Sequence, residues 1–291
     1  MPSESLPLVR VVVKHAREAF RDRARIEAEW RALNFTAAPD LARAIDEYDR
    51  WLALLSSSGA QVLSLPASDE VTLDSIYARD ASVVTPRGML LCRMGKAARA
   101  TESEAQARAF RAWGIPIAGA IEEPGRLEGG DLVWLDARTV AVGRGYRTNQ
   151  DGIRQLRAQL GPDVEVIEVP LPHWRGPSDV FHLMSIVSPI DRDLAVVYAP
   201  LLPIPFRETL IERGYTLVDV PDEELGSMGA NVLAIAPRRC IALDGNPETR
   251  RRLERAGAEV LVYDGIEISV KGGGGPTCLT RPIERELLTQ S

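Results

Sequence analysis

One sequence pattern recurs five times along this chain: a predicted helix with an apolar face, a glycine, and a predicted short apolar strand. The five glycines lie about 43 to 55 residues apart, at Gly59, Gly114, Gly161, Gly214 and Gly257. Glycine just past a helix is a common terminator, so one occurrence of the pattern carries little information. Five occurrences at near-regular spacing indicate an internal repeat in which each unit is one small supersecondary structure. The pattern therefore predicts a mixed α/β fold built from five similar units.

Each unit also carries a polar landmark about 14 to 21 residues after its glycine, beside an apolar segment. The landmarks are Asp80, Glu128, His182, Asn231 and Cys278. If the units surround an axis, equivalent positions converge, and these side chains meet near the centre. A turn residue or a satisfied polar group explains any one landmark alone, but it explains five equivalent positions poorly.

The last landmark lies in the sequence KGGGGPTCL, from Lys271 to Leu279. Consecutive glycines adopt backbone angles closed to other residues and let a ligand approach the main chain closely. The preceding segment, Val260 to Val270, is rich in β-branched residues and is predicted to be a strand. We interpret the stretch as a strand that runs into a tight loop presenting the thiol of Cys278. A passive turn beside a small buried cysteine is the alternative.

The N-terminal region predicts three further elements. Leu8 to Lys14 is apolar enough for a buried strand, and residues 16–39 are charged, which fits either solvated helix and loop or a flap that forms a lid over a site. Asp40 stands where a helix N-cap belongs, and apolar residues at helical spacing follow it to Leu55. No low-complexity linker or change in composition divides the chain, so residues 1–291 are predicted to form a single catalytic domain.

Composition narrows the class of protein. A hydrophobic fraction of 45% and a charged fraction of 26% are those of an ordinary soluble globular protein. A net charge of -6 without basic and aromatic clusters argues against nucleic-acid binding, and the short, proline-broken apolar runs argue against a membrane span. Met1 to Arg10 does not resemble a secretory signal. The remaining cysteines, Cys92 and Cys240, make an odd total with wide spacing, which favours reduced thiols in a cytoplasmic protein.

The landmarks suggest cysteine chemistry. A cysteine acts as a nucleophile when its pKa is lowered or when a neighbouring base takes its proton. His182 lies in the apolar segment Val180 to Val187, predicted to be a strand, where either a catalytic role or a satisfied core position explains it. Glu128 can orient His182, and Asp80 can accept a cationic group such as a guanidinium. Zinc-ligand spacing and a complete dinucleotide or phosphate loop are missing from the sequence, so no metal and no cofactor are expected.

These motifs resemble those of the guanidine-modifying enzymes of the pentein fold, which include arginine deiminases, dimethylarginine dimethylaminohydrolases and amidinotransferases. The resemblance runs from about Leu8 to Thr280 through RD, LEGGD, the histidine followed by leucine, NVL and GGGPTCLT. It implies five ββαβ-type repeats in a pseudo-fivefold α/β propeller.

The resemblance also implies roles for the landmarks. Cys278 would attack the guanidino carbon, and His182 would protonate the leaving amine and then activate water against a covalent thiouronium intermediate. Glu128 would hydrogen-bond His182 or a substrate nitrogen, and Asp80 would clamp the guanidinium. The implied partner is a small-molecule guanidino or ureido amino acid, and a homo-oligomer is left open.

Three further residues enter on the same resemblance. Arg147, within RTN, is similar to the arginine that holds the substrate carboxylate in the family, and Arg99 is a weaker candidate for that role. Asn231 is expected to contact the substrate.

Met184 stands where arginine deiminases and amidinotransferases carry an aspartate that grips a second guanidinium nitrogen. An apolar residue there leaves room for alkyl groups, and dimethylaminohydrolases also lack the aspartate. Arg79 is a second departure, because many dimethylaminohydrolases have glutamate at this position.

The resemblance therefore favours a hydrolase of dimethylarginine type, which forms citrulline and dimethylamine. Citrulline hydrolysis and arginine deimination are the near alternatives. An amidinotransferase is less favoured. A non-catalytic ribosome-binding pentein is also less favoured, because such a protein has no use for Glu128, His182 and Cys278 together.

Overall fold

The computed structural model describes residues 3–177 and 181–286, whose strands form five three-stranded sheets. In every sheet the first strand pairs antiparallel with the second, and the third pairs parallel with the second. In this order the sheets are β15 (Thr280–Arg285), β1 (Leu8–Val13) and β2 (Gln61–Ser64); β3 (Ser82–Thr85), β4 (Gly88–Leu91) and β5 (Ile117–Ala120); β6 (Leu132–Asp136), β7 (Thr139–Arg144) and β8 (Glu165–Pro170); β9 (Val187–Asp191), β10 (Leu194–Val197) and β11 (Thr216–Asp219); β12 (Leu233–Ala236), β13 (Arg239–Leu243) and β14 (Glu259–Tyr263).

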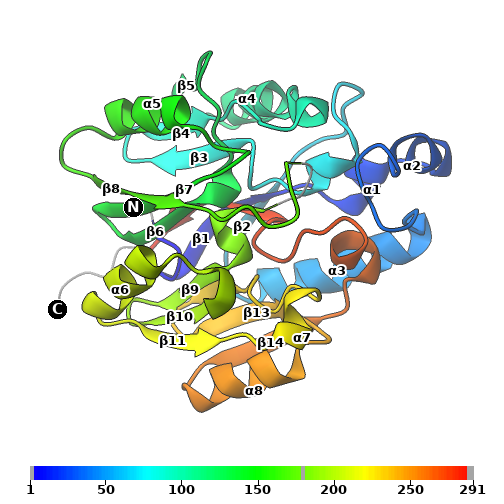
Figure 1. Ribbon diagram of the computed structural model, residues 1–291. Helices are drawn as coiled ribbons and strands as arrows, with labels where there is room; N and C mark the ends of the chain where they lie inside the picture. Colours follow the sequence, from blue (N-terminus) through cyan, green and yellow to red (C-terminus); the bar gives the residue numbers. More distant parts are fainter. Residues whose placement is uncertain (1–2, 178–180, 287–291) are drawn as a thin grey trace.

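A helix connects the second and third strands of each sheet, which gives five ββαβ units. The connecting helices are α3 (Leu41–Ser56), α4 (Glu102–Ala112), α5 (Gln150–Leu160), α6 (Ile204–Glu212) and α8 (Pro247–Arg255). The short helices α1 (Ala16–Phe20), α2 (Arg23–Glu29) and α7 (Asp222–Leu225) lie outside this pattern. Figure 1 shows the helices at the periphery with the sheets between them. The predicted α/β fold of repeated small units is confirmed.

The two ends of the chain complete one unit together. β15, close to the C-terminus, pairs antiparallel with β1 from Leu8↔Arg285 to Val13↔Thr280. This pairing ties the loop that carries Cys278 to the N-terminal strand. The closed, pseudo-fivefold arrangement of the units stays a prediction.

The five repeat glycines all have a positive φ angle. Their φ angles are +80° at Gly59, +68° at Gly114, +81° at Gly161, +85° at Gly214 and +85° at Gly257. A side chain at such a φ crowds the following carbonyl, so glycine is the residue that ends each connecting helix at low cost. Their predicted role as helix terminators is confirmed.

Helix α3 begins and packs largely as predicted. The Asp40 side chain accepts a hydrogen bond from Arg43 N at 3.0 Å, as an N-cap does, and Tyr48, Trp51 and Leu55 are buried. The unexpected member of the buried face is Glu47, whose carboxylate accepts Glu267 N at 2.7 Å.

The predicted strand from Val260 to Val270 is wrong in its second half. Strand β14 ends at Tyr263, and Ile266–Val270 forms a single π-helical turn. The Glu47 carboxylate caps the first amides of this turn, Glu267 N and Ile268 N, so those amides are unavailable to a sheet ladder. The turn, rather than a strand, leads into the glycine-rich loop.

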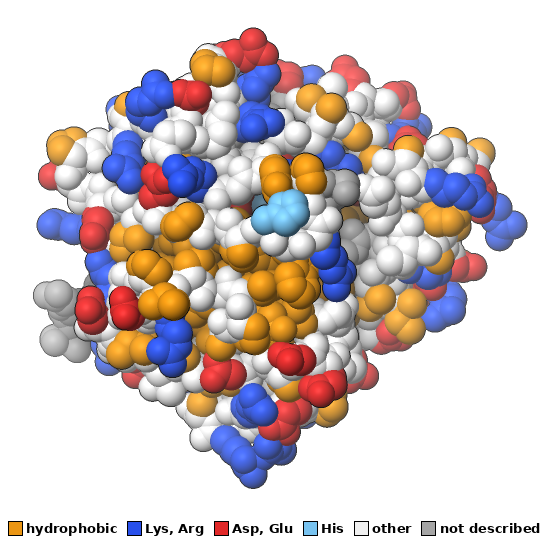
Figure 2. All heavy atoms as spheres, viewed as in Figure 1, with side chains coloured by type: hydrophobic (Ala, Val, Ile, Leu, Met, Phe, Trp, Pro, Cys, Tyr) orange, Lys and Arg blue, Asp and Glu red, His pale blue; other side chains and the backbone are white. Residues whose placement is uncertain are grey.

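Hydrophobic side chains gather on the face shown in Figure 2, on the side where Figure 1 places α6, with charged side chains around them. Ile204 and Ile211 of α6 are 72% and 47% exposed. The three cysteines are free, and no helix in the described part of the chain is long and apolar enough to cross a membrane. The homo-oligomer stays a prediction.

The backbone requirement at the repeat glycines can be measured at one of them. A Cβ added at Gly161 would meet no atom within 4 Å, so Gly161→Ala should cost only the backbone strain at φ +81° and ψ 179°, about 1–3 kcal/mol of unfolding free energy in urea titrations. Gly226 is equally open but has a helical φ of -65°, so Gly226→Ala should change stability by less than about 1 kcal/mol. Equal costs for the two variants would contradict this origin of the glycine repeat.

Candidate active site

The five landmarks occupy one structural position, the connection that enters the first strand of a sheet. Asp80 precedes β3, Glu128 precedes β6, His182 precedes β9, Asn231 precedes β12 and Cys278 precedes β15. A cavity of about 370 Å³ is lined by His182, Asn231 and Cys278, and a smaller space shares His182 and Cys278 with it and adds Asp80. Glu128 joins the group through a hydrogen bond to His182. The structure thus brings all five predicted residues together.

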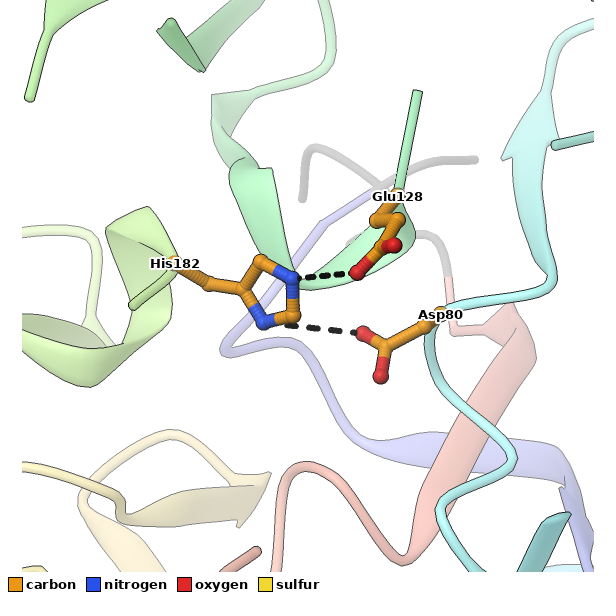
Figure 3. Close-up of side chains that lie close together, drawn as sticks. All are labelled: Asp80, Glu128 and His182. Atoms are coloured by element: carbon orange, nitrogen blue, oxygen red, sulfur yellow. Dashed lines mark hydrogen bonds and ion pairs between the residues drawn. The ribbon is translucent and has the colours of Figure 1, made fainter. Parts of the chain in front are cut away.

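His182 lies between two buried carboxylates (Figure 3). Its Nε2 is 2.7 Å from Glu128 Oε2, and its Nδ1 is 3.9 Å from Asp80 Oδ1. Burial alone would lower the pKa of His182, but Asp80, Asp131 and Glu128 outweigh it and raise this pKa to about 9. Burial alone would raise the pKa of each partner carboxyl, but the His182 cation and nearby arginines hold the pKa of Glu128 and of Asp80 below the usual range. At neutral pH the group is an imidazolium held by two carboxylates.

The predicted strand around His182 is wrong from Phe181 to Ile186, and residue 180 lies outside the described residues. His182 instead caps a 3-10 turn, Leu183–Ser185, in front of β9. Its backbone N–H donates to Ser185 Oγ at 3.1 Å, and Leu183 N donates to Asp131 Oδ1 at 3.0 Å. Because these two side chains take the backbone donors, the segment turns and directs the imidazole at Glu128.

All four residues of the sequence EGGD contribute to this arrangement. A Cβ at Gly129 would lie 2.2 Å from Arg79 O, and one at Gly130 would lie 2.5 Å from His182 Nδ1 and 2.8 Å from Asp80 Oδ1. Gly130 N also donates to Asp80 Oδ1 at 3.0 Å. Asp131 supports the His182 turn, a role that sequence reasoning missed although Asp131 belongs to the quoted motif.

The two predicted arginines are buried against the site carboxylates. Arg147 Nη1 lies 3.1 Å from Glu128 Oε2, and Arg99 Nη1 lies 2.6 Å from Asp80 Oδ2. The other Arg99 nitrogens donate to Glu102 and to Tyr77 O. Arg99 is therefore engaged with protein acceptors on every nitrogen. Both arginines line the inner space beside Asp80.

This pairing of charges bears on metal binding. One ligand atom each from Asp80, Glu128 and His182 lies within 4.8 Å of the others, a spacing compatible with a metal ion. Each carboxylate, however, already holds a guanidinium in addition to the imidazolium. The donor set fits an ion-pair network better than a metal centre, since a metal would require neutral His182 and compete with two arginines.

Cys278 is partly exposed at the edge of this network, with Asn231 beside its sulfur. Asn231 Nδ2 donates to Cys278 Sγ at 3.3 Å, while Asn231 Oδ1 accepts Thr277 N at 3.0 Å and Thr277 Oγ1 at 2.8 Å. Burial and the charge of Asp80 raise the pKa of Cys278, and the bonds from Asn231 and Thr277 oppose that rise. Sequence reasoning assigned Asn231 to the substrate, and the structure places it on the thiol.

The glycine run lets the loop pass close to aromatic and amide side chains. A Cβ at Gly272 would lie 1.9 Å from Tyr77 Oη, one at Gly274 would lie 2.3 Å from the Tyr77 ring, and one at Gly275 would lie 2.5 Å from Asn231 Oδ1. Gly273 has a left-handed φ of +77°. Packing requires glycine at three of the four positions, and the backbone angle requires it at Gly273. The sequence alone indicated only that the loop could adopt unusual backbone angles.

Arg79 is a further buried group at the thiol that the sequence marked only as a departure. Its Nε donates to Thr277 O at 2.9 Å, and its backbone N donates to Cys278 O at 3.2 Å. Its positive charge opposes the rise in the pKa of Cys278. A glutamate at this position would instead repel a thiolate.

Two other predicted features lie at the cavity. Met184 is buried and lines it beside His182. The end of the 16–39 segment crosses the glycine-rich loop, where Thr36 N donates to Lys271 O at 2.8 Å and Asn34 lines the cavity. The first part of the segment forms α1 and α2.

Comparison with known proteins agrees with this fold. Five sheets of identical construction with a cysteine, a histidine and carboxylates at their entrances define the class of guanidino-modifying α/β enzymes. The family described as N,N dimethylarginine dimethylhydrolase, eukaryotic, matches residues 20–285, so this chain belongs to the dimethylarginine dimethylaminohydrolase family.

Individual relatives include proteins named for the favoured activity and for one of its near alternatives, arginine deimination. The N(G),N(G)-dimethylarginine dimethylaminohydrolase of Streptomyces coelicolor is 31% identical over 83% of this chain and 86% of its own length. The arginine deiminase of Mycobacterium marinum is 32% identical over 56% of this chain, which spans less than half (47%) of that protein. The dimethylarginine dimethylaminohydrolase of Pseudomonas aeruginosa, solved as a Cys-to-Ser mutant with citrulline, has the same fold, with a TM-score of 0.76 and 22% identity over 94% of this chain and 99% of that one.

The contact of Gly130 with His182 and Asp80 predicts a sensitive position. Gly130→Ala should displace one or both groups by about 1 Å and lower the rate of any reaction catalysed here by roughly 10²-fold. Gly145→Ala is the matched control, because its Cβ would meet only Leu171 at 3.4 to 4.0 Å. Thermal melts should show both variants folded, and unchanged turnover in Gly130→Ala would contradict the geometry.

The charge on His182 predicts a pH-dependent contribution to stability. Its pKa is raised from 6.5 to about 9, so the charged form stabilises the folded chain fully below pH 6.5, and this contribution is lost as pH rises through about 9. The difference in unfolding free energy between the unaltered protein and His182→Gln should therefore shrink by a few kcal/mol from pH 6.5 to pH 9.5, at about 1.36 kcal/mol per pKa unit. Urea titrations at several pH values measure it, and a difference independent of pH would show that His182 is neutral.

Proposed function

We propose that this chain is a dimethylarginine dimethylaminohydrolase that uses Cys278 as its nucleophile and converts dimethylarginine to citrulline and dimethylamine. The observation that carries the proposal is the shared cavity of Cys278, His182 and Asp80, with Glu128 hydrogen-bonded to His182. Family membership supports the guanidino class of substrate. No cofactor is invoked, and the substrate is a small guanidino amino acid.

Asp80 binds the positive charge of the substrate guanidinium. Its carboxylate is buried, borders the inner space with Cys278, and is oriented by Arg99. A guanidinium bound there gains a charge-assisted contact in a water-poor site. The cation also offsets the negative field of Asp80, which together with burial keeps the thiol protonated. Binding of a cationic substrate thus favours loss of the thiol proton to solvent.

The first chemical step forms a C–S bond. The Cys278 thiolate attacks the guanidino carbon, the bond from that carbon to the dimethylated nitrogen breaks, and the His182 imidazolium gives its proton to the departing dimethylamine. Asn231, which donates to the sulfur, stabilises the thiolate before attack. The product of this step is a thiouronium on Cys278.

The second step releases citrulline. Neutral His182 takes a proton from water, and the resulting hydroxide attacks the thiouronium carbon. The C–S bond then breaks to return the thiolate, and the proton of the added hydroxyl passes to solvent as the carbonyl of citrulline forms. Glu128 holds the imidazole by the 2.7 Å contact and stabilises the imidazolium that forms again. Both proton transfers use one imidazole, so the site needs no second acid.

Met184 supports the dimethylated substrate over arginine. A methionine provides apolar contact for methyl groups, about 0.8 kcal/mol per buried carbon, and no charged hydrogen bond for an unsubstituted nitrogen. Citrulline hydrolysis and arginine deimination are the competing activities. Citrulline competes because its neutral ureido group needs no carboxylate at this position, whereas arginine loses a charged contact there.

The wider organisation is part of the proposal. Convergence of five equivalent positions supports a pseudo-fivefold propeller of residues 1–291 acting as one catalytic domain. The contacts of Thr36 and Leu33 with Lys271 and Lys96 support residues 16–39 as a lid over the glycine-rich loop. The three free cysteines are compatible with a cytoplasmic enzyme.

A substrate panel tests the function. Purified protein is given dimethylarginine, monomethylarginine, arginine or citrulline, and the released amine, citrulline and ornithine are quantified. We expect dimethylarginine to have a kcat/KM at least about tenfold above arginine, and Met184→Asp to shift the ranking towards arginine while Met184→Leu does not. A best activity on arginine or citrulline in the unaltered protein would reject the dimethylarginine assignment.

The position of Arg147 gives it two alternative roles that kinetics separate. If it holds the substrate carboxylate, Arg147→Lys raises KM for amino-acid substrates and leaves kcat nearly unchanged. If it only positions Glu128, kcat falls also for a dimethylated alkylguanidine that lacks a carboxylate. We expect the first pattern, with at least about a tenfold rise in KM, and a loss of kcat shared by both substrates would contradict it.

A further inference from the structure

A second cavity, of about 250 Å³, lies between α4 and the loop that follows β2, and it shares no lining residue with the active-site cavity. Its α4 wall is at the top of Figure 1. The apolar part of the lining comes from Leu65, Val71, Ala105 and Ala109. The polar part comes chiefly from Lys14 at the end of β1, from Ser75 and from Glu102.

Two of these polar groups lack a partner among the described residues, and one of them, the Ser75 hydroxyl, is fully buried. Lys14 is 3% exposed, and within residues 3–177 and 181–286 no carboxylate oxygen lies within 4.0 Å of its ammonium group and no acceptor is in hydrogen-bond range. Ser75 is 5% exposed, and its Oγ also lacks a hydrogen-bond partner. Buried donors in folded proteins are nearly always paired, because an unpaired one costs free energy.

The acidic side chain that lines the cavity is already paired. Glu102 borders the cavity, but its Oε1 accepts Arg99 Nε at 2.9 Å and its Oε2 accepts Arg99 Nη2 at 2.8 Å. Burial is the main reason why the pKa of Lys14 falls to about 8, and Glu102 only partly opposes it. The cavity therefore holds an amine without a counter-ion and a hydroxyl donor, beneath apolar walls.

We propose that this cavity binds a small carboxylic acid with an apolar body, whose carboxylate is held by Lys14 and Ser75. A carboxylate supplies the acceptor that both groups lack, and its alkyl portion lies against Leu65, Val71 and Ala109. At about 30 Å³ of liquid volume per water-sized group, the space holds roughly eight heavy atoms, which is the size of hexanoate.

The rim of the cavity is already organised. Glu18 accepts Ala67 N at 3.1 Å, and Arg25 and Arg108 bond to the same loop through Val71 O and Glu70. Residues 66–71 are thus fixed to α1, α2 and α4 before any ligand arrives. The ligand needs to order little of the protein, which favours binding.

The chain has only three lysines, which makes a direct experiment practical. Lys96 and Lys271 are paired with Asp74 and Glu267 at 2.6 Å and 2.5 Å. After reductive methylation with ¹³C-formaldehyde, the Lys14 resonance is identified by its loss in Lys14→Met, and it is titrated against pH with and without hexanoate. We expect saturable binding of hexanoate that raises the pKa of Lys14, with no effect from hexan-1-ol.

Three variants of the protein test the proposal further. Calorimetry should show hexanoate binding at least about tenfold weaker in Lys14→Met and several-fold weaker in Ser75→Ala. Arg147→Gln, which alters the catalytic cavity, should bind hexanoate as the unaltered protein does. An unmoved Lys14 resonance, equal effects of hexanoate and hexan-1-ol, or undiminished binding in Lys14→Met would each overturn the proposal.

Discussion

The catalytic region is organised by one buried histidine cation between two carboxylates. His182, Glu128 and Asp80 are each at most 3% exposed, so their charges gain little from water and must be balanced within the protein. Arg147 and Arg99 complete the balance, one on each carboxylate. Removing one member of such a buried network leaves an uncompensated charge, which typically costs about 3–5 kcal/mol. The network therefore fixes both the protonation state of the imidazole and the position of the groups around it.

This constraint explains why the active-site segments are turns and not strands. Gly129 and Gly130 allow the backbone to pass against Arg79 O and the His182 ring, where any side chain would displace the pair. Asp131 takes the amide of Leu183 and so turns the chain that carries His182. Cys278 lies outside the charge-balanced group, with Asn231 hydrogen-bonded to its sulfur. Its thiol remains protonated because burial and the negative charge of Asp80 both disfavour a thiolate there.

The sequence allowed the repeated architecture to be predicted because its determinants are local. A glycine with a positive φ angle ends each connecting helix, as Gly161 and Gly214 do, and such a glycine can be recognised from the sequence. The regular spacing of these glycines then gives the number of units. The errors arose where a distant side chain overrides local propensity. Glu47 caps the turn at Glu267, 220 residues away in sequence, and Asp131 holds Leu183, 52 residues away. The composition of residues 260–270 and 180–187 does not show that a distant carboxylate accepts hydrogen bonds from their backbone amides. The pairing of Arg99 with Asp80 and the hydrogen bond from Asn231 to the thiol likewise depend on tertiary contacts, which the sequence does not reveal.

The most direct test of the covalent route is to observe what is attached to Cys278 during turnover. Protein turning over dimethylarginine is quenched in acid within milliseconds, digested, and analysed by mass spectrometry at the peptides that carry Cys92, Cys240 and Cys278. We expect a transient mass increase equal to citrulline less one water on the Cys278 peptide alone, the same whether dimethylarginine or monomethylarginine is used, because both lose their alkylated amine before the intermediate forms. Product formation at full rate in Cys278→Ala, or an adduct on Cys92 or Cys240 in place of Cys278, would contradict a thiouronium intermediate at this site.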